Sequence, residues 1–352
     1  MPSENRLFYV DAIRAYAILL VVVSHVFAPV CAGMNDYPRA VWWVFNVLDS
    51  AIRPCVPLFV MISGKLLIGS AREETYLQFA WRRFSKLLLP FFSWSMIYAY
   101  YEARMQGNDF DAGRSVLEFL QGPTEFHLWF MYMILGLYLV APFLRRFVRA
   151  AAPSELAALL GLWFGSLVLE FFFPGYAGSG PTLTLLNYGG YFILGYVLDQ
   201  DGFSRLEAGW LIAISIVIVV FNAAGTYLLM AQNGGTLDEK FYVGIAPLVA
   251  IYAAGVYLLM RHADYEKILA KAPRLRGIVS LLSLESYNLY LIHVLFLWLF
   301  TKGHLGFVLS ENTGGSPLAG VPLTAAMVLA GSLALSVVLQ RIPVVSRLLV
   351  IP

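Results

Sequence analysis

Long apolar runs constrain this chain more than any other feature of its sequence. Runs of roughly 18 to 25 apolar residues are long enough to cross the hydrocarbon core of a bilayer. Ten such runs lie near residues 8–30, 41–69, 84–101, 127–144, 156–173, 182–198, 209–230, 241–260, 277–300 and 318–340. They lack sustained alternation and are too long for tilted strands, so each must satisfy its backbone hydrogen bonds as a helix. We therefore predict an all-α bundle of about ten transmembrane helices.

Charged residues are scarce, and their placement predicts an orientation. They make up 13% of the 352 residues, about half the usual share, which excludes a soluble globular protein and a disordered chain. If the N-terminus is cytoplasmic, 16 basic residues lie in the inner connections and 5 in the outer ones. This bias predicts that both termini are cytoplasmic. No connection resembles a linker, so we expect one integral membrane domain over residues 1–352 without an appended soluble domain.

Other ligand classes receive no support from the composition. A net charge of +2 gives no reason to expect nucleic acid. Cys31 and Cys55 lack metal-ligand spacing, so we expect no metal. The apolar run that follows Arg6 continues to Val30 without a small-residue cleavage site, which predicts a retained span rather than a signal peptide.

The first span carries two polar side chains that are costly at membrane depth. Arg14 and His25 are eleven residues apart, which is three helical turns plus about 20° and roughly 16 Å along the axis. They therefore share a face, with the cation nearer the cytoplasm. Arginine suits phosphate or carboxylate, and a neutral histidine can act as a general base. The structural alternative is that Arg14 pairs with Asp11 while His25 is hydrogen-bonded inside the bundle.

Further polar residues lie at the two membrane depths of Arg14 and His25, one near the cytoplasmic side and one near the outer side. Arg83 and Lys86, three apart at the inner start of the third span, can meet an anionic ligand from the cytoplasm. Glu125 and His127 begin the fourth span at its outer end, and the ninth span runs outwards through Tyr290 and His293. Inner cations and outer histidines together predict a site that takes an anionic substrate from one side and performs acid/base chemistry towards the other.

The second span contains helix-breaking residues. Pro54 and Pro57 follow Asp49 and Arg53, and they should interrupt the helix and place irregular backbone against a cavity. Ser63 has no base predicted at its depth, and close helix packing is the favoured role of Gly64.

These motifs also carry a resemblance. The segment from Arg6 to Arg14, followed by His25, resembles the opening of the acyltransferase 3 family of integral membrane acyltransferases. The stretch from Phe59 to Gly64, the basic entry from Arg83 to Lys86, the segment from His127 to Phe130 and the stretch from Ser286 to His293 are similar to its later landmarks, in order. The resemblance covers nearly the whole chain.

The resemblance implies a function. Family members transfer acyl groups, usually acetyl, from acyl-coenzyme A to hydroxyls of surface glycans, with an essential arginine and histidine that match Arg14 and His25. Two arginines are implied in the third span, where this chain has Arg83 and Lys86, so a bidentate contact becomes a point charge. The chain is similar to the single-domain branch, which includes enterobacterial common antigen acetyltransferases, and a bacterial inner (cytoplasmic) membrane location follows.

These inferences combine into one expected mechanism. Acetyl-coenzyme A enters from the cytoplasm, with its phosphates at Arg14, Arg83 and Lys86. His25 then deprotonates a hydroxyl of a cell-surface or lipid-linked glycan, either directly or by way of an acyl-histidine. Supporting residues are also expected: Glu125 or His127 orients His25, and the substrate-binding set comprises Asp11, Trp129, Tyr290 and His293.

Alternatives remain open at this stage. The same buried charges suit a secondary transporter or a lipid-linked glycan flippase, and a regulatory membrane protein without catalysis is a third reading. The acceptor, the acyl group and the formation of a homo-oligomer are not determined by these residues.

Overall fold

The computed structural model describes residues 5–72, 74–175, 181–200, 202 and 205–351. All secondary structure in these ranges is helical. The longer helices are α1 (Asn5–Ala32), α2 (Arg39–Ile52), α3 (Cys55–Ile68), α4 (Tyr76–Met105), α5 (Ala112–Gln121), α6 (Trp129–Ala150), α7 (Pro153–Phe172), α8 (Pro181–Asp199), α9 (Arg205–Gln232), α10 (Pro247–His262), α12 (Pro273–Thr301) and α13 (Pro317–Gln340). The short ones are η1 (Phe126–Leu128), α11 (Tyr265–Lys271), η2 (Thr313–Gly315) and α14 (Pro343–Leu349). The predicted all-α class is confirmed.

Seven segments of the described residues are both long and apolar enough to cross a membrane. They are Phe8–Ala32, Arg39–Ile68, Phe126–Ala150, Pro153–Phe172, Gly209–Gln232, Pro273–Thr301 and Pro317–Gln340. The chain is thus a polytopic membrane protein, but the expected number of ten spans is not confirmed. The other three expected spans coincide with α4, α8 and α10. At 16 residues, α10 reaches about 24 Å, which is shorter than the roughly 30 Å hydrocarbon core.

Local sequence signals set several helix starts. Thr75 and Gln78 form a reciprocal capping box at the start of α4, the arrangement that satisfies two otherwise unpaired backbone N–H groups. Ser316 caps α13 by accepting a hydrogen bond from the Leu318 N–H group. Proline occupies the first turn of α7, α10, α12 and α13, where its missing N–H costs no helical hydrogen bond.

The predicted interruption of the second span is confirmed. Helix α2 ends at Ile52, α3 begins at Cys55, and a turn at Arg53 and Pro54 separates them. The two helices together form the segment Arg39–Ile68. In its most apolar stretch 61% of the residues are buried, whereas only 6% are buried in the most apolar stretch of α7. The interrupted segment is therefore in the interior and α7 is at the periphery.

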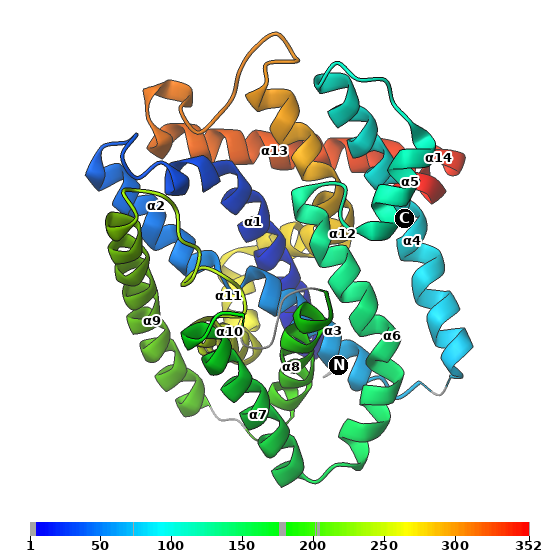
Figure 1. The fold of residues 1–352 in the computed structure, drawn as a ribbon. Coiled ribbons are helices and arrows are strands. Elements are labelled where there is room, and N and C mark those ends of the chain that lie inside the picture. Colours follow the sequence, from blue (N-terminus) through cyan, green and yellow to red (C-terminus); the bar gives the residue numbers. More distant parts are fainter. Residues whose placement is uncertain (1–4, 73, 176–180, 201, 203–204, 352) are drawn as a thin grey trace.

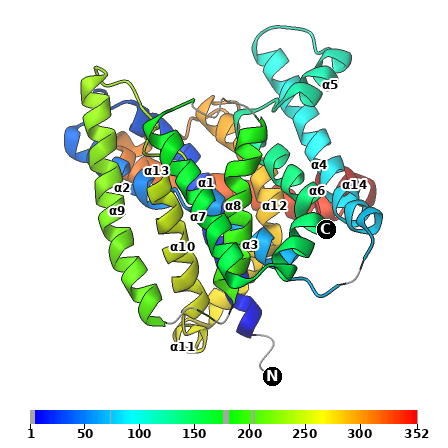
Figure 2. The ribbon, with the colours of Figure 1, turned by 60° about the horizontal axis from the view of Figure 1, so that its bottom comes forward.

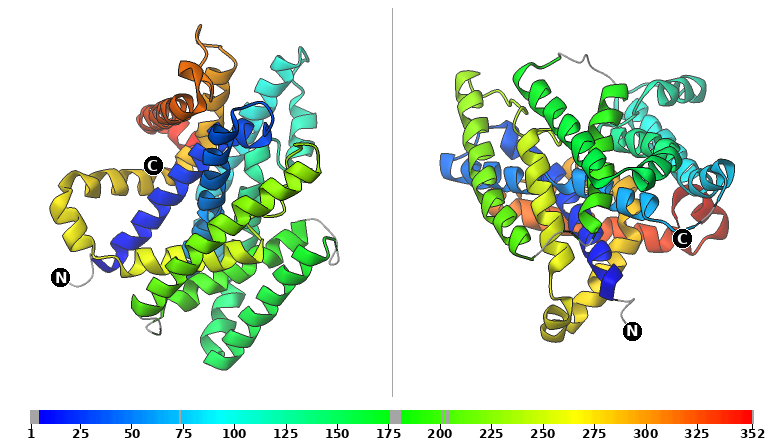
Figure 3. Two further views of the ribbon diagram at one scale, coloured as in Figure 1. Left: turned by 90° about the vertical axis from the view of Figure 1, so that its left-hand side faces the viewer. Right: turned by 90° about the horizontal axis from the view of Figure 1, so that it is seen from below.

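The bundle has a packed centre and two thinner edges. In Figure 2, α9 lies at one edge and α4, α5 and α14 at the other, with α1, α3, α8 and α12 between them. Figure 1 shows the connection between α6 and α7 at the lower end and the loop between α4 and α5 at the upper end, in accord with their predicted opposite sides. Figure 3 shows the start of α1 beside α11, where the Phe8 and Tyr265 rings meet edge to face at 5.1 Å.

Two glycines let α3 and α8 approach each other closely. A Cβ atom on Gly64 would lie 1.7 Å from the Phe192 carbonyl oxygen, and one on Gly195 would lie 2.0 Å from the Met61 carbonyl oxygen. Both contacts are with backbone, which cannot move aside as a side chain can. The predicted packing role of Gly64 is therefore confirmed, and it agrees with the use of small residues between membrane helices.

The first prediction tests this contact. We expect Gly64→Ala to destabilise the protein by at least about 1–3 kcal/mol, because the added methyl group forces α3 and α8 apart. Gly161→Ala is the matched control, since Gly161 lies in α7 with open space at its Cβ position. Thermal unfolding in detergent measures both variants, and equal midpoints for the two would contradict the close contact.

Candidate functional site

Two cavities occupy the middle of the bundle, and both contact α1. The inner cavity, about 530 Å³ in volume, is lined by Asp11 and Arg14 among others. The outer cavity, about 470 Å³, is lined by His25. Volumes of this size suit small-molecule substrates. The single helix α1 therefore presents its cation to one cavity and its titratable ring to the other.

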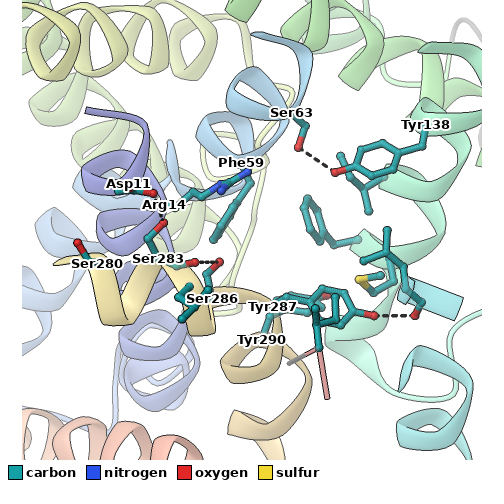
Figure 4. Close-up of a pocket in the computed structure, with 16 residues that line it drawn as sticks. Asp11, Arg14, Phe59, Ser63, Tyr138, Ser280, Ser283, Ser286, Tyr287 and Tyr290 are labelled. Atoms are coloured by element: carbon teal, nitrogen blue, oxygen red, sulfur yellow. Dashed lines mark hydrogen bonds between the residues drawn. The ribbon is translucent and has the colours of Figure 1, made fainter. Parts of the chain in front are cut away.

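Arg14 has no hydrogen bond or ion pair with any described residue. Its neighbour Asp11 instead accepts a hydrogen bond of 2.7 Å from the Ser283 hydroxyl on α12. Figure 4 shows the Arg14 side chain extending into the inner cavity towards Phe59. The pairing of Arg14 with Asp11, considered from the sequence, does not form. A half-buried guanidinium without a counterion is free to bind an anionic or strongly polar ligand.

Hydroxyl groups surround Arg14 in the inner cavity. Ser280, Ser283 and Ser286 line one wall from successive turns of α12. On the opposite side, the Ser63 and Tyr138 hydroxyls are 3.4 Å apart. None of the described residues that line this cavity is a histidine, so Ser63 has no imidazole base there to activate it. The inner cavity thus places several hydroxyl groups, which can donate and accept hydrogen bonds, around the Arg14 guanidinium.

Phe130 and Tyr290 form the wall between the cavities. Of the described residues, these two line both cavities, and their ring centroids are 5.4 Å apart. The Tyr290 hydroxyl donates a hydrogen bond to the His127 carbonyl oxygen, which anchors the tyrosine ring to η1. We refer to this pair as the aromatic septum. Any group that passes from Arg14 to His25 through the cavities must pass it.

Three histidines from three different elements meet above the septum. The His25 ring stacks on the His293 ring with centroids 5.3 Å apart and an interplanar angle of 23°. His293 in turn contacts His127 edge to face at 5.2 Å. Phe126 covers His25 from another side at 5.0 Å. The structure therefore brings together the outer histidines that the sequence predicted at one depth, with His293 in the centre.

The hydrogen bonds of this group determine which nitrogens are available. The Nδ1 atom of His293 lies 2.8 Å from the Tyr290 carbonyl oxygen and 3.1 Å from that of Leu289, so it must donate its proton there. Its Nε2 atom is buried without a partner, as are both ring nitrogens of His127. Such unpartnered buried groups cost free energy. They lie close to His25, and in its neutral form each of the two rings has one unpartnered nitrogen that can accept a proton.

The interruption between α2 and α3 places an arginine, Arg53, at the outer cavity. Arg53 lines this cavity, forms an ion pair with Asp49 and lies over the Tyr242 ring, 4.4 Å from its centroid. The Tyr242 hydroxyl donates to the side-chain oxygen of Asn46. These successive contacts with Asp49 and Tyr242 hold the Arg53 guanidinium in one orientation.

The remaining predicted residues lie at various distances from this centre. Trp129 lines the outer cavity and packs on Tyr188 at 5.6 Å. Arg83 lies over the Phe79 ring and Lys86 is exposed, and neither lines the Arg14 cavity. Glu125 is buried directly before η1 but contacts neither cavity. The structure therefore groups Arg14 and His25 with the septum and separates the third-span cations from them.

Sequence reasoning missed some of the residues that shape the site. Phe130 ends the segment from His127 that carries the family resemblance, but nothing in its spacing, or in that of Tyr138 on the same helix, indicates that it lines a cavity. Arg53 was recognised only as part of the predicted interruption, although an ionisable residue inside an apolar run is itself a signal of a functional site. Ser283 could have been identified from its fixed spacing to Ser280 and Ser286.

Comparison with known proteins adds one finding. A family model described as an acyltransferase domain matches residues 7–341. No curated protein and no solved structure matches the chain.

The second prediction concerns Glu125. Burial raises the pKa of its carboxyl group to about 7, and the hydrogen bond from the Phe126 backbone opposes that rise. A carboxyl group whose pKa is raised in the folded state stabilises the fold below its unfolded pKa of about 4.5 and loses that contribution as pH rises to 7. We expect the free energy of unfolding to fall by up to about 3 kcal/mol over this interval.

Two variants test this expectation. Glu125→Gln cannot ionise, so its unfolding midpoint should depend less on pH between 5 and 7 than that of the native chain. Glu118→Gln is the control, because Glu118 is exposed and pairs with Arg114 on the surface. Identical pH profiles for the native chain and Glu125→Gln would contradict the raised pKa.

Proposed function

The chain belongs to the acyltransferase 3 family, and we propose that it transfers an acetyl group from acetyl-coenzyme A to a hydroxyl of a cell-surface or lipid-linked glycan. The family assignment itself makes the chain a membrane acyltransferase, which favours transfer over transport. The observation that carries the proposal is the placement of Arg14 and His25 in two cavities that share one wall.

The inner cavity is the donor side in this proposal. Arg14 offers an uncompensated charge, and the surrounding serine and tyrosine hydroxyls can bind the amide and hydroxyl groups of a pantetheine arm. The phosphates lie towards the predicted cytoplasmic side, where the proposed contacts are Arg14 in the cavity and, outside the cavity, Arg83 and Lys86. Eleven residues of helix between Arg14 and His25 correspond to about 16 Å, a distance suited to an extended arm that carries its thioester to the septum.

His25 is the general base of the proposed reaction. It takes the proton from the acceptor hydroxyl while the hydroxyl oxygen attacks the thioester carbonyl carbon. The carbon–sulfur bond then breaks, and the coenzyme A thiolate leaves and receives the proton from His25. The stacked His293 ring holds the orientation of His25, because its own Nδ1 proton is committed to backbone carbonyls. An acyl-histidine on His25 would use the same arrangement.

The outer cavity is the acceptor side. Trp129 offers an aromatic face to a sugar ring, and Arg53 offers fixed donors for hydroxyl oxygens. Glu239 lies exposed at the same cavity and can accept hydrogen bonds from hydroxyl groups. A donor that enters from the cytoplasm and an acceptor on the other side of the septum are consistent with a multi-pass protein of a bacterial inner membrane.

The third prediction distinguishes the role of His25 as general base from the role of Arg14 in binding acetyl-coenzyme A. His25→Ala should lower kcat for acetyl transfer by about 10²- to 10⁴-fold, the usual contribution of a general base. Arg14→Ala should chiefly raise KM for acetyl-coenzyme A, by about 10- to 100-fold, because a charged hydrogen bond is lost. Labelled acetyl-coenzyme A and purified protein provide the measurement.

The matched control is His304→Ala, because His304 is exposed, bonds to the Tyr101 hydroxyl and lies outside both cavities. Full transfer activity in His25→Ala would end the proposal for this residue. A purified native protein that moves a glycan across vesicles without transferring acetyl would favour the flippase alternative.

The fourth prediction concerns the aromatic septum. Removing the Phe130 ring widens the passage, so Phe130→Ala should increase the activity ratio of butyryl- to acetyl-coenzyme A by about tenfold, since one or two methylenes in an apolar site are worth about 1–3 kcal/mol. Phe59→Ala is the control, because Phe59 lines the inner cavity but not the outer one. An unchanged ratio in Phe130→Ala, or an equal increase in both variants, would mean that the septum does not select acyl length.

A further inference from the structure

A third cavity lies apart from the two described above, and arginines dominate its lining. It has a volume of about 260 Å³ and lies between the start of α4 and the end of α6. Among the residues that the structure describes, four arginines line it, namely Arg72, Arg145, Arg146 and Arg149, together with one acidic residue, Glu74. Glu74 forms an ion pair with Arg82 and a longer one, at 4.0 Å, with one Nη atom of Arg145, so this carboxylate is shared between two arginines. None of the lining residues contacts the inner or the outer cavity.

Arg145 is held in place rather than free to follow solvent. It is 9% exposed, its Nε atom donates to the Leu67 carbonyl oxygen at 2.8 Å, and one Nη atom donates to the Arg72 carbonyl oxygen at 3.3 Å. Its other Nη atom is buried without a hydrogen-bond partner. Arginines that merely reach for the membrane surface keep their charged ends in water. This guanidinium instead presents a desolvated donor to the cavity.

The adjoining surface of α6 is apolar and exposed. Leu139, Phe143 and Phe147 are spaced four residues apart and are 44%, 59% and 50% exposed. They form a stripe that runs from the arginine cavity along the helix, and Phe143 lines the cavity itself. Arg145, Arg146 and Arg149 lie at the C-terminal end of α6, the end predicted to face the cytoplasm. A charged cavity at a membrane edge, continuous with an apolar stripe towards the membrane centre, matches the form of a phospholipid.

We propose that the cavity formed by Arg72, Arg145, Arg146 and Arg149 binds the phosphate of an anionic phospholipid, with an acyl chain along Leu139, Phe143 and Phe147. Guanidinium groups bind phosphate oxygens in paired hydrogen bonds. Basic pockets between transmembrane helices on the cytoplasmic side are known to bind anionic headgroups. The site is separate from acyl transfer, so the two proposals stand or fail independently.

The test measures lipid binding directly. Purified protein in detergent is titrated with phosphatidylglycerol, and its thermal unfolding midpoint and the lipid retained in native mass spectrometry are recorded. We expect saturable stabilisation by phosphatidylglycerol and little by phosphatidylcholine. The double variant Arg146→Gln, Arg149→Gln should weaken the apparent affinity by about 5-fold for each arginine removed. It alters exposed side chains and leaves the buried contacts of Arg145 intact.

Two further measurements complete the test. Arg274→Gln is the control, because Arg274 is an exposed arginine on the predicted cytoplasmic side outside this cavity, and it should bind lipid as the native chain does. Inorganic phosphate and adenosine 3′,5′-bisphosphate are titrated in parallel. Stabilisation by these soluble phosphates without stabilisation by phosphatidylglycerol would overturn the lipid assignment, and so would equal lipid affinity in the double variant and the native chain.

Discussion

The cost of an unpaired polar group in an apolar medium governs this structure. At membrane depth a backbone or side-chain group without a partner loses several kcal/mol of solvation, so the bundle satisfies most of them. Glu285, for example, accepts hydrogen bonds from Asn288, Ser336 and Gln340. Asp199 forms ion pairs with Lys65 and Arg261. The buried polar atoms that have no hydrogen-bond partner are therefore exceptions that need an explanation.

Buried polar atoms without a hydrogen-bond partner occur in several parts of the bundle, Asn222 among them, and two sets lie near the cavities. His127 and His293 have unpartnered ring nitrogens near the aromatic septum, and Arg145 has an unpartnered Nη atom at the arginine cavity. Arg14 lines the inner cavity. Polar groups held in this condition must be supported by their surroundings. Here the support comes from neighbouring contacts, such as the backbone carbonyls that orient His293 and Arg145. Binding of a ligand would compensate the missing partners, which is the physical basis of both proposals.

Packing geometry creates the spaces in which these groups lie. The backbone contact at Gly64 and Gly195 holds α3 against α8, while the turn at Arg53 and Pro54 ends α2 before α3 begins. The interruption turns Arg53 towards the outer cavity, and the fixed α3 carries Phe59 and Ser63 to the inner one. One broken span thus serves both cavities, as α1 does with Arg14 and His25.

The sequence by itself determined the membrane setting, the helical class, the family and the shared face of Arg14 and His25, because hydropathy and helical spacing are local properties. It also located the break at Pro54 and the packing role of Gly64. The expected number of ten spans is not confirmed, and α10 is shorter than its apolar run suggested. Only the tertiary structure decided that Asp11 bonds to Ser283 instead of Arg14, that His293 rather than His127 stacks on His25, and that Phe130 and Tyr290 divide the cavities. These facts depend on contacts between distant helices, whose rotation and depth no local pattern encodes.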